Sequence, residues 1–207
     1  MTYHDVSEAL AEPGCVVCRL VANSVDCYLR GLLHESVNDP GMRERLRASK
    51  GFCREHSWQL QRRGDPLSIS ILWHDLLSPE LDEDPGRRRR AGGRRKPLCP
   101  ACEIAVEAER RYVGILVEHL EVGALRNEYA ASAGLCLPHL GLARIAAPAG
   151  ARCFLATAES DKLTRLREEL SEIIRKNDHR FRDEPWGSER DAWIRATRKL
   201  AGEPPET

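Results

Sequence analysis

Apolar residues recur at helical spacing in two separate regions of the chain. In the first region they are Val17, Val21, Val25, Tyr28 and Leu32. In the second they are Ala101, Ala105, Ala108, Tyr112, Ile115 and Leu116. Steps of three and four residues place such side chains on one face of a helix. The pattern therefore predicts one amphipathic helix in each region.

Turn and capping residues predict where shorter helices begin and end. The segment 38–41, Asn-Asp-Pro-Gly, predicts a turn before a short helix that ends at Lys50-Gly51. Asp65 and Pro66 are typical N-cap and first-position residues, so they predict the start of another helix. A matching helix is expected to begin near Ala151.

The C-terminal region also has a helical pattern. Residues 163–174 carry an apolar stripe, and Ser188 and Asp191 resemble a capping box before a last helix that Gly202 would end. Trp186 and Trp193 are expected to anchor this segment. Taken with the central helices, these patterns predict an all-α fold.

A cysteine and histidine motif occurs twice along these predicted helices. Each copy consists of Cys-x-x-Cys followed about 34 residues later by Cys-x-x-His. Three thiolates and an imidazole at these spacings are the ligand set of a closed tetrahedral zinc site. We therefore predict two Zn²⁺ ions per chain. The predicted metal ligands are Cys15, Cys18, Cys53 and His56 in the first copy and Cys99, Cys102, Cys136 and His139 in the second.

The predicted fold consists of two tandem helical repeats, each organised around one Cys-x-x-Cys and Cys-x-x-His metal site, followed by C-terminal helices. Helix lengths allow the Cys53 pair to return to the Cys15 pair. Pairing across the copies stays open. We expect a first zinc repeat at 1–78, a charged linker at 79–97, a second zinc repeat at 98–160, and C-terminal helices packing on the repeats at 161–207.

Other chemistry is less favoured at these cysteines. An iron-sulfur cluster remains an alternative, as does a thiol redox pair, although redox Cys-x-x-Cys motifs need a strand-rich surround that the pattern does not predict. Cys27 and Cys153 lie outside the motif and are expected to be buried apolar thiols. Four protein ligands leave no open position for water, which argues against a hydrolytic zinc enzyme. No catalytic residue is predicted.

Composition and charge exclude few partners. Lys plus Arg and Asp plus Glu each number 32 in 207 residues, so no general field for nucleic acid or an anionic membrane is expected. The run from Arg87 to Lys96 could contact nucleic acid, but basic runs in linkers are usually solvated. The first ten residues lack the pattern of an export signal, and no apolar run reaches membrane-spanning length. We expect a cytoplasmic protein with reduced thiols.

The combination of motifs resembles a known prokaryotic family. The residues that carry the resemblance are the doubled cysteine motif, the stretch VNDPGMRERLRASKGFC and the tail KNDHRFRDEPWGSERDAWIRATRKLAG. Together they are similar to the family called domain of unknown function 6062. Gly134-Leu135-Cys136 departs from the Gly-Phe-Cys that is common there. The resemblance implies a helical, metal-binding protein and implies no activity.

Three functions are compatible with these features. The favoured one is a non-enzymatic zinc protein, an adaptor or scaffold whose helical surface binds another protein. The second is a regulator, either a metal or thiol sensor or a nucleic-acid binder. The third is an iron-sulfur protein or an enzyme with a cofactor pocket between the repeats. No Gly-rich phosphate loop or paired carboxylates at metal spacing supports an enzyme. The sequence does not indicate an oligomeric state.

Overall fold

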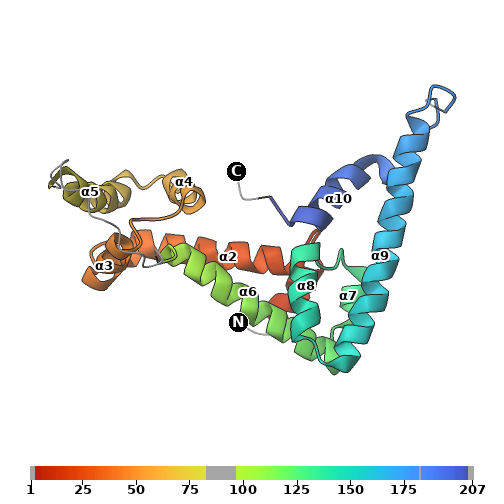
Figure 1. The fold of residues 1–207 in the computed structure, drawn as a ribbon, viewed down its shortest axis with the longest axis horizontal. Coiled ribbons are helices and arrows are strands. Elements are labelled where there is room, and N and C mark those ends of the chain that lie inside the picture. The colour runs from red at the N-terminus through yellow and green to blue at the C-terminus, as the bar shows by residue number, and fades with distance from the viewer. Residues whose placement is uncertain (1–2, 83–96, 182, 205–207) are drawn as a thin grey trace, which may run out of the picture. The chain divides into compact units, whose positions relative to one another are not determined.

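The computed structural model describes residues 3–82, 97–181 and 183–204, and every regular element in these ranges is helical (Figure 1). The all-α prediction is therefore confirmed for the described residues. The elements are α1 (Tyr3–Leu10), α2 (Val16–Gly31), a π-helical turn η1 (Leu32–Ser36), α3 (Pro40–Ala48), α4 (Arg54–Arg62), α5 (Pro66–Asp82), α6 (Pro100–Glu121), α7 (Arg126–Ala131), α8 (Leu137–Ala146), α9 (Ala149–Lys176), a 3₁₀ turn η2 (Ser188–Asp191) and α10 (Ala192–Ala201).

The chain forms two compact units. One comprises Met1–Val21 together with Glu109–Pro204, and the other contains Ala22–Ala108. The unit boundaries fall inside α2 and α6, the two helices predicted from apolar spacing. The predicted linker at 79–97 begins within α5, and its residues 83–96 lie outside the described part of the chain. The predicted domain boundaries stay a prediction.

The unit within 22–108 has its core where α2 meets η1, α3, α4 and α5. Both α3 and η1 pack against α5. The buried side chains of this core come from all of these elements and from the start of α6: Val25, Leu29, Leu32, Leu33, Val37, Leu46, Phe52, Leu60, Ile69, Leu72, Cys99 and Ala101. Cys99, which belongs to the second motif copy, is thus part of a core that residues around the first copy mainly form.

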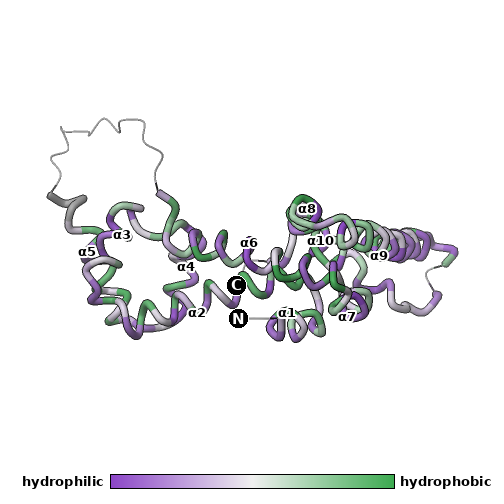
Figure 2. Tube along the Cα trace, turned by 90° about the horizontal axis from the view of Figure 1, so that it is seen from below, coloured by the Kyte–Doolittle hydropathy of each residue, from purple (hydrophilic) through white to green (hydrophobic). Residues whose placement is uncertain are grey.

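In the other unit, α9 packs against α8, α10 and η2, and α1 packs against α7. The C-terminal part of α9 is mostly hydrophilic (Figure 2), and the buried residues of this helix, Ala151, Leu155 and Glu159, lie nearer its start. Fully buried side chains at the centre of this unit include Leu116, Leu120, Leu125, Tyr129, Leu135, Leu140 and Leu155. The core therefore surrounds the segment that leads to Cys136.

Several predicted helix boundaries are confirmed. Asp39 caps α3 by accepting a hydrogen bond from the backbone N–H of Met42 at 2.7 Å. The helix ends before Lys50, which has a φ of 52°. Asp65 likewise accepts from the backbone N–H of Ser68 at 3.0 Å, at the start of α5. Capping residues predict these helix ends correctly because each capping hydrogen bond joins residues that are close in sequence.

Two expectations for the C-terminal region are wrong. The segment from Ser188 to Asp191 is a 3₁₀ turn, and Asp191 makes no side-chain capping bond to α10. Trp193 does not anchor the segment, because 61% of its surface is exposed, whereas Trp186 has 51% of its surface exposed and contacts Lys176 of α9, whose Nζ lies 5.8 Å from the ring centroid. The buried residues of α10 are instead Ala192 and Lys199.

Within the described ranges, no helix combines the length and apolar character needed to cross a membrane.

Candidate metal centres

All four ligand pairs have the same local structure. Each first cysteine directly precedes a helix, and its carbonyl accepts the first helical hydrogen bond, from Arg19, Ser57, Glu103 or Leu140 at 2.8 to 3.2 Å. The second ligand of each pair follows three residues later, in the first turn. The free N–H groups and the dipole at a helix N-terminus favour a thiolate there. Each ligand pair therefore lies at the start of a helix.

The structure brings the eight residues into two clusters that could each hold a metal ion. Site A consists of Cys15, Cys18, Cys136 and His139, and site B consists of Cys53, His56, Cys99 and Cys102. In each site the four ligand atoms lie within 4.8 Å of one another. Each site therefore takes its Cys-x-x-Cys from one motif copy and its Cys-x-x-His from the other.

This crossed arrangement corrects the expectation that each copy is organised around its own metal site. A return of Cys53 to Cys15 required α3 to run back along α2. Instead, α2 continues through η1, and α3 packs against α5. Cys53 consequently reaches the start of α6 and meets Cys99 and Cys102. Chain length permitted both pairings, so it did not decide between them.

The ligand distances fit a tetrahedral zinc ion. With Zn–S near 2.3 Å and Zn–N near 2.05 Å, tetrahedral angles require roughly 3.8 Å between sulfurs and roughly 3.5 Å between sulfur and nitrogen. In site A, Cys18 Sγ lies 3.8 Å from Cys136 Sγ. The Nδ1 atom of His139 lies 3.4, 3.3 and 3.1 Å from the sulfurs of Cys15, Cys18 and Cys136.

Site B has similar dimensions, apart from one shorter distance between sulfurs. Cys102 Sγ lies 3.7 Å from Cys53 Sγ and 3.1 Å from Cys99 Sγ. The Nδ1 atom of His56 lies 3.2, 3.3 and 3.4 Å from the sulfurs of Cys53, Cys99 and Cys102. Since a disulfide needs a sulfur separation near 2.05 Å, none of these contacts is a disulfide. All of these cysteines are free.

The close packing of thiols alters their proton affinities. In site A, hydrogen bonds from Cys136 and Cys18 hold the pKa of Cys15 far below its usual range, and hydrogen bonds to Cys136 and Cys15 raise the pKa of Cys18. Burial opposes protonation of His139, but hydrogen bonds to Cys136 and Cys15 outweigh it and raise the pKa to about 10. Site A thus favours a thiolate beside an imidazolium, and a bound cation would replace these protons.

Site B shows the same division between thiols. Burial disfavours the thiolate of Cys99, yet hydrogen bonds from His56 and from the backbone of Cys53 lower its pKa to about 6. Burial and the neighbouring thiols raise the pKa of Cys102. One thiol therefore loses its proton easily while its neighbour keeps it, as expected where several anionic groups share a small volume.

Two glutamates complete the surroundings of site A. The Nε2 atom of His139 lies 2.9 Å from Glu109 Oε1, so the ring can donate to a carboxylate while Nδ1 faces the sulfurs. Glu203 accepts a hydrogen bond from the backbone N–H of Cys15 at 3.1 Å, and its own backbone N–H lies 3.5 Å from Cys18 Sγ. Glu203, just after α10, thus contacts two of the cysteines of site A.

A buried ion pair fixes the segment before Cys136. The fully buried Glu159 accepts hydrogen bonds from Tyr129 Oη, Lys199 Nζ and, at 3.1 Å, the backbone N–H of Leu135. These contacts join α7, α9 and α10 to the residue that precedes the ligand Cys136. Gly134 fits this site because its φ is 77° and a Cβ there would lie 2.2 Å from Glu159 Oε1.

Glu109, Glu159 and Glu203 are not predicted by any pattern in the sequence. Nothing in their local sequence separates them from other charged helical residues, since each finds its partner through tertiary packing. The expectation that Cys27 and Cys153 are buried is wrong, because both cysteines are exposed. The run from Arg87 to Lys96, the basis of a nucleic-acid alternative, lies outside the described residues.

Comparisons with known proteins place the chain beside relatives without an assigned function. The model of a family of unknown function, DUF6062, matches residues 88–207. An uncharacterized 23.9 kDa protein in the xynA 3′ region of Caldicellulosiruptor sp. (strain Rt8B.4) is 28% identical over 181 residues, covering 84% of this chain and 87% of that protein. No solved structure matches the chain.

Proposed function

The chain belongs to the DUF6062 family of unknown function, and we propose that it is a non-enzymatic helical protein whose two CCCH clusters hold structural zinc. The observation that carries this proposal is that each site gathers three sulfurs and one imidazole nitrogen, with the histidine Nδ1 atom 3.1 to 3.4 Å from every sulfur, close to the spacing of a filled tetrahedral shell. Three thiolates and a neutral imidazole give each zinc site a net charge of about minus one. No ligand position remains for a reacting water molecule.

The crossed ligand pairs explain why zinc would stabilise this fold. Site A joins residues that are more than 110 positions apart, and site B joins Cys53 to Cys99. Metal binding to such sites counts as folding free energy, about 10 to 16 kcal/mol in zinc-finger peptides. Each zinc ion would thus hold together segments whose own apolar contacts are limited by a content of only 5% aromatic residues.

We further propose that the chain acts as an adaptor that binds another protein. Trp193 and Leu200 lie seven residues apart on α10, and 61% and 63% of their surface is exposed. Residues at this spacing share one helix face. An exposed apolar patch rimmed by polar residues is typical of protein-binding surfaces. Free thiols that serve as metal ligands fit a reducing compartment, so we propose a cytoplasmic location.

Elemental analysis of the purified full chain tests the metal assignment. We expect about two zinc ions per chain, whereas stoichiometric iron with sulfide would contradict zinc. The adaptor role is tested by affinity purification of the wild type and a Trp193→Ser/Leu200→Ser variant in parallel. A partner recovered with the wild type and lost with the variant, at equal zinc content, supports the adaptor role. Equal recovery would contradict it.

A further inference from the structure

A cavity of about 390 Å³ lies beside site A, within a single compact unit. Its walls come from the segment 130–136, from α9, from α10 with η2, and from the chain at 13–15. This volume falls within the range of small-molecule sites, about 300 to 1,000 Å³. Of the four residues of site A, Cys15 and Cys136 contribute to the cavity wall.

The wall of the cavity carries more positive than negative side chains. Its cations are Lys162, Arg165, Arg195, Arg198 and Lys199, and its carboxylates are Glu169 and Asp191. Arg195 binds both carboxylates, at 2.7 Å to Glu169 and 2.8 Å to Asp191. Both carboxylates of the wall therefore pair with Arg195. Neither of them pairs with any of the other four cations of the wall.

Two of those four cations form ion pairs with carboxylates that do not line the cavity. Lys199 pairs with the buried Glu159, and Arg198 Nε lies 3.2 Å from Glu203 Oε2. Lys162 and Arg165 differ from them. Lys162 Nζ donates to the backbone carbonyls of Ala130 and Ser132, both at 2.7 Å, and these acceptors carry no full charge.

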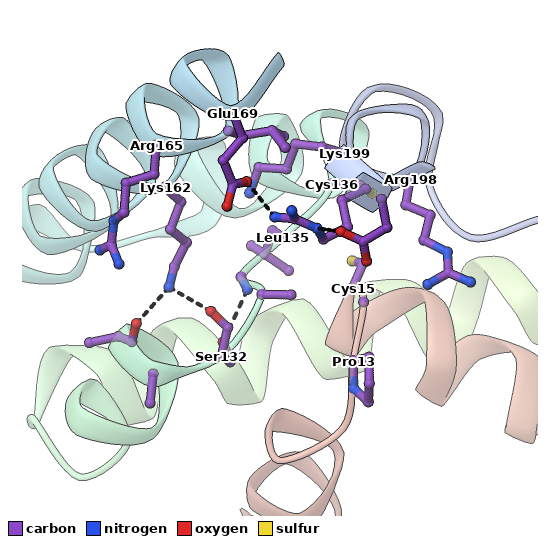
Figure 3. A pocket seen from close by; sticks show the side chains of 18 residues that line it. Pro13, Cys15, Ser132, Leu135, Cys136, Lys162, Arg165, Glu169, Arg198 and Lys199 are labelled. Carbon is purple, nitrogen blue, oxygen red and sulfur yellow. Dashed lines mark hydrogen bonds and ion pairs between the residues drawn. The ribbon is translucent and has the colours of Figure 1, made fainter. Parts of the chain in front are cut away.

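Arg165 makes no hydrogen bond or ion pair with any residue in the described ranges. It lies three residues after Lys162 on α9, so both side chains leave the same helix face. Figure 3 shows both extending from α9 on the side that faces Ser132. Burial lowers the pKa of Lys162, and the positive charges of Lys199 and Arg165 lower it further, against the opposing effect of Glu159.

We propose that this cavity binds a small organic anion, whose carboxylate or phosphate group pairs with Arg165 and Lys162. The apolar part of the molecule lies against Ala133 and Leu166, which line the same cavity. A guanidinium binds carboxylate and phosphate oxygens through two parallel hydrogen bonds, and the ammonium of Lys162 adds a point charge. The proposal is independent of which metal occupies site A.

Calorimetric titration of the full chain with simple probes tests this site. Phenyl phosphate and benzoate carry the expected anionic group on an apolar ring, and benzyl alcohol is the neutral match. We expect saturable binding of at least one anion with a Kd at or below about 1 mM, and at least tenfold weaker binding of the alcohol. Equal binding of the alcohol would overturn the proposal, as would no binding of either anion.

A substitution on α9 tests whether Arg165 contacts the bound anion. Arg165→Gln should weaken anion binding roughly tenfold, the loss of about one charge-assisted hydrogen bond. Arg167→Gln is the matched control, because Arg167 is exposed on the same helix and does not line the cavity. Zinc content is measured in each preparation and should not change. If Arg165→Gln bound the anion as tightly as the control, the proposed site would be wrong.

Discussion

The imidazole of His139 bridges the thiol cluster of site A and the carboxylate of Glu109. Its Nδ1 atom lies 3.1 Å from Cys136 Sγ, and its Nε2 atom lies 2.9 Å from Glu109 Oε1. A carboxylate in this position fixes the ring orientation and the tautomer that leaves Nδ1 free to bind a metal. Site B differs, because within the described residues no carboxylate contact to His56 is found. The two metal sites are therefore chemically unequal.

Glu109→Ala should weaken zinc binding at site A by about 10-fold to 100-fold and leave site B unchanged. Competition with a chromophoric chelator would measure the two affinities separately. Glu118→Ala is the control, since Glu118 is an exposed residue of the same helix, α6. Equal zinc affinities at site A in the two variants would mean that Glu109 does not support the ligand.

The buried pair of Glu159 and Lys199 should have a large effect on stability. Lys199→Met leaves the carboxylate of Glu159 without its cation, and Glu159→Gln leaves the buried ammonium unpaired. Each change should lower the free energy of unfolding by about 3 to 5 kcal/mol, measured by urea denaturation in excess zinc. The double variant Glu159→Leu/Lys199→Met should cost less than the sum of the two single changes, because no unpaired charge remains.

An exposed pair provides the control for this prediction. Glu184→Gln breaks a contact with Arg175 at the surface, where solvent screens the charges, and should cost less than about 1 kcal/mol. If the Lys199 and Glu159 variants unfolded at the same urea concentration as Glu184→Gln, the proposed role of the buried pair would be incorrect.

Gly202 should not tolerate a side chain. Its φ of 91° and ψ of −177° lie in a region that only glycine adopts readily. A Cβ there would also approach Cys18 Sγ to 3.2 Å. We expect Gly202→Ala to cost about 1 to 3 kcal/mol in thermal or urea unfolding and to speed loss of zinc from site A. Gly141→Ala is the control, because a Cβ at this position in α8 meets no atom within 4 Å.

Glu189 should give stability that depends on pH. A hydrogen bond from the backbone N–H of Gly187, together with Lys176, lowers the pKa of Glu189 from 4.5 to about 2. A carboxylate with a lowered pKa stabilises the fold above pH 4.5, and this contribution is lost as the pH falls through about 2. The stability difference between the wild type and Glu189→Gln should therefore be constant near neutral pH and shrink below pH 4.5.

Urea unfolding of both proteins at several pH values measures this difference. Both carry the same metal sites, so zinc loss in acid cancels when the two curves are subtracted. Glu168→Gln, an exposed substitution on α9, should show no such dependence. A stability difference for Glu189→Gln that did not shrink below pH 4.5 would indicate that the carboxylate is not the stabilising group.

The parts of the fold that depend on neighbouring residues could be predicted from the sequence. The apolar spacing of α2 and α6 and the caps at Asp39 and Asp65 act over three or four residues, and the structure confirms them. The position of each ligand pair at a helix start is equally local.

The missed features depend on tertiary packing. Whether Cys53 meets Cys15 or Cys99 depends on the direction in which α3 and α4 leave η1, and the length of the connecting chain leaves that direction open. Cys27 is exposed because it lies on the outer side of α2, next to the charged Asp26. Glu109 and Glu203 act on site A from helices and loops far from it in sequence.

The crossed pairing of ligands can be tested by counting zinc ions in double variants. Cys53→Ser/Cys102→Ser removes two ligands of site B and should leave one zinc ion per chain, because site A stays complete. Cys15→Ser/Cys53→Ser removes one ligand from each site and should leave neither site with its full shell, since a hydroxyl is a poor zinc ligand at neutral pH. Zinc content after dialysis against a mild chelator distinguishes the two proteins.

Pairing within each motif copy predicts the opposite result. In that case Cys15→Ser/Cys53→Ser would damage a single site and keep one zinc ion, while Cys53→Ser/Cys102→Ser would damage both sites. Cys27→Ser/Cys153→Ser is the control and should keep two zinc ions, because both cysteines are exposed and belong to neither cluster. Unfolding of these variants adds a second measure, since each lost zinc ion should lower stability by several kcal/mol. A zinc ion retained by Cys15→Ser/Cys53→Ser and lost by Cys53→Ser/Cys102→Ser would therefore rule out the crossed sites.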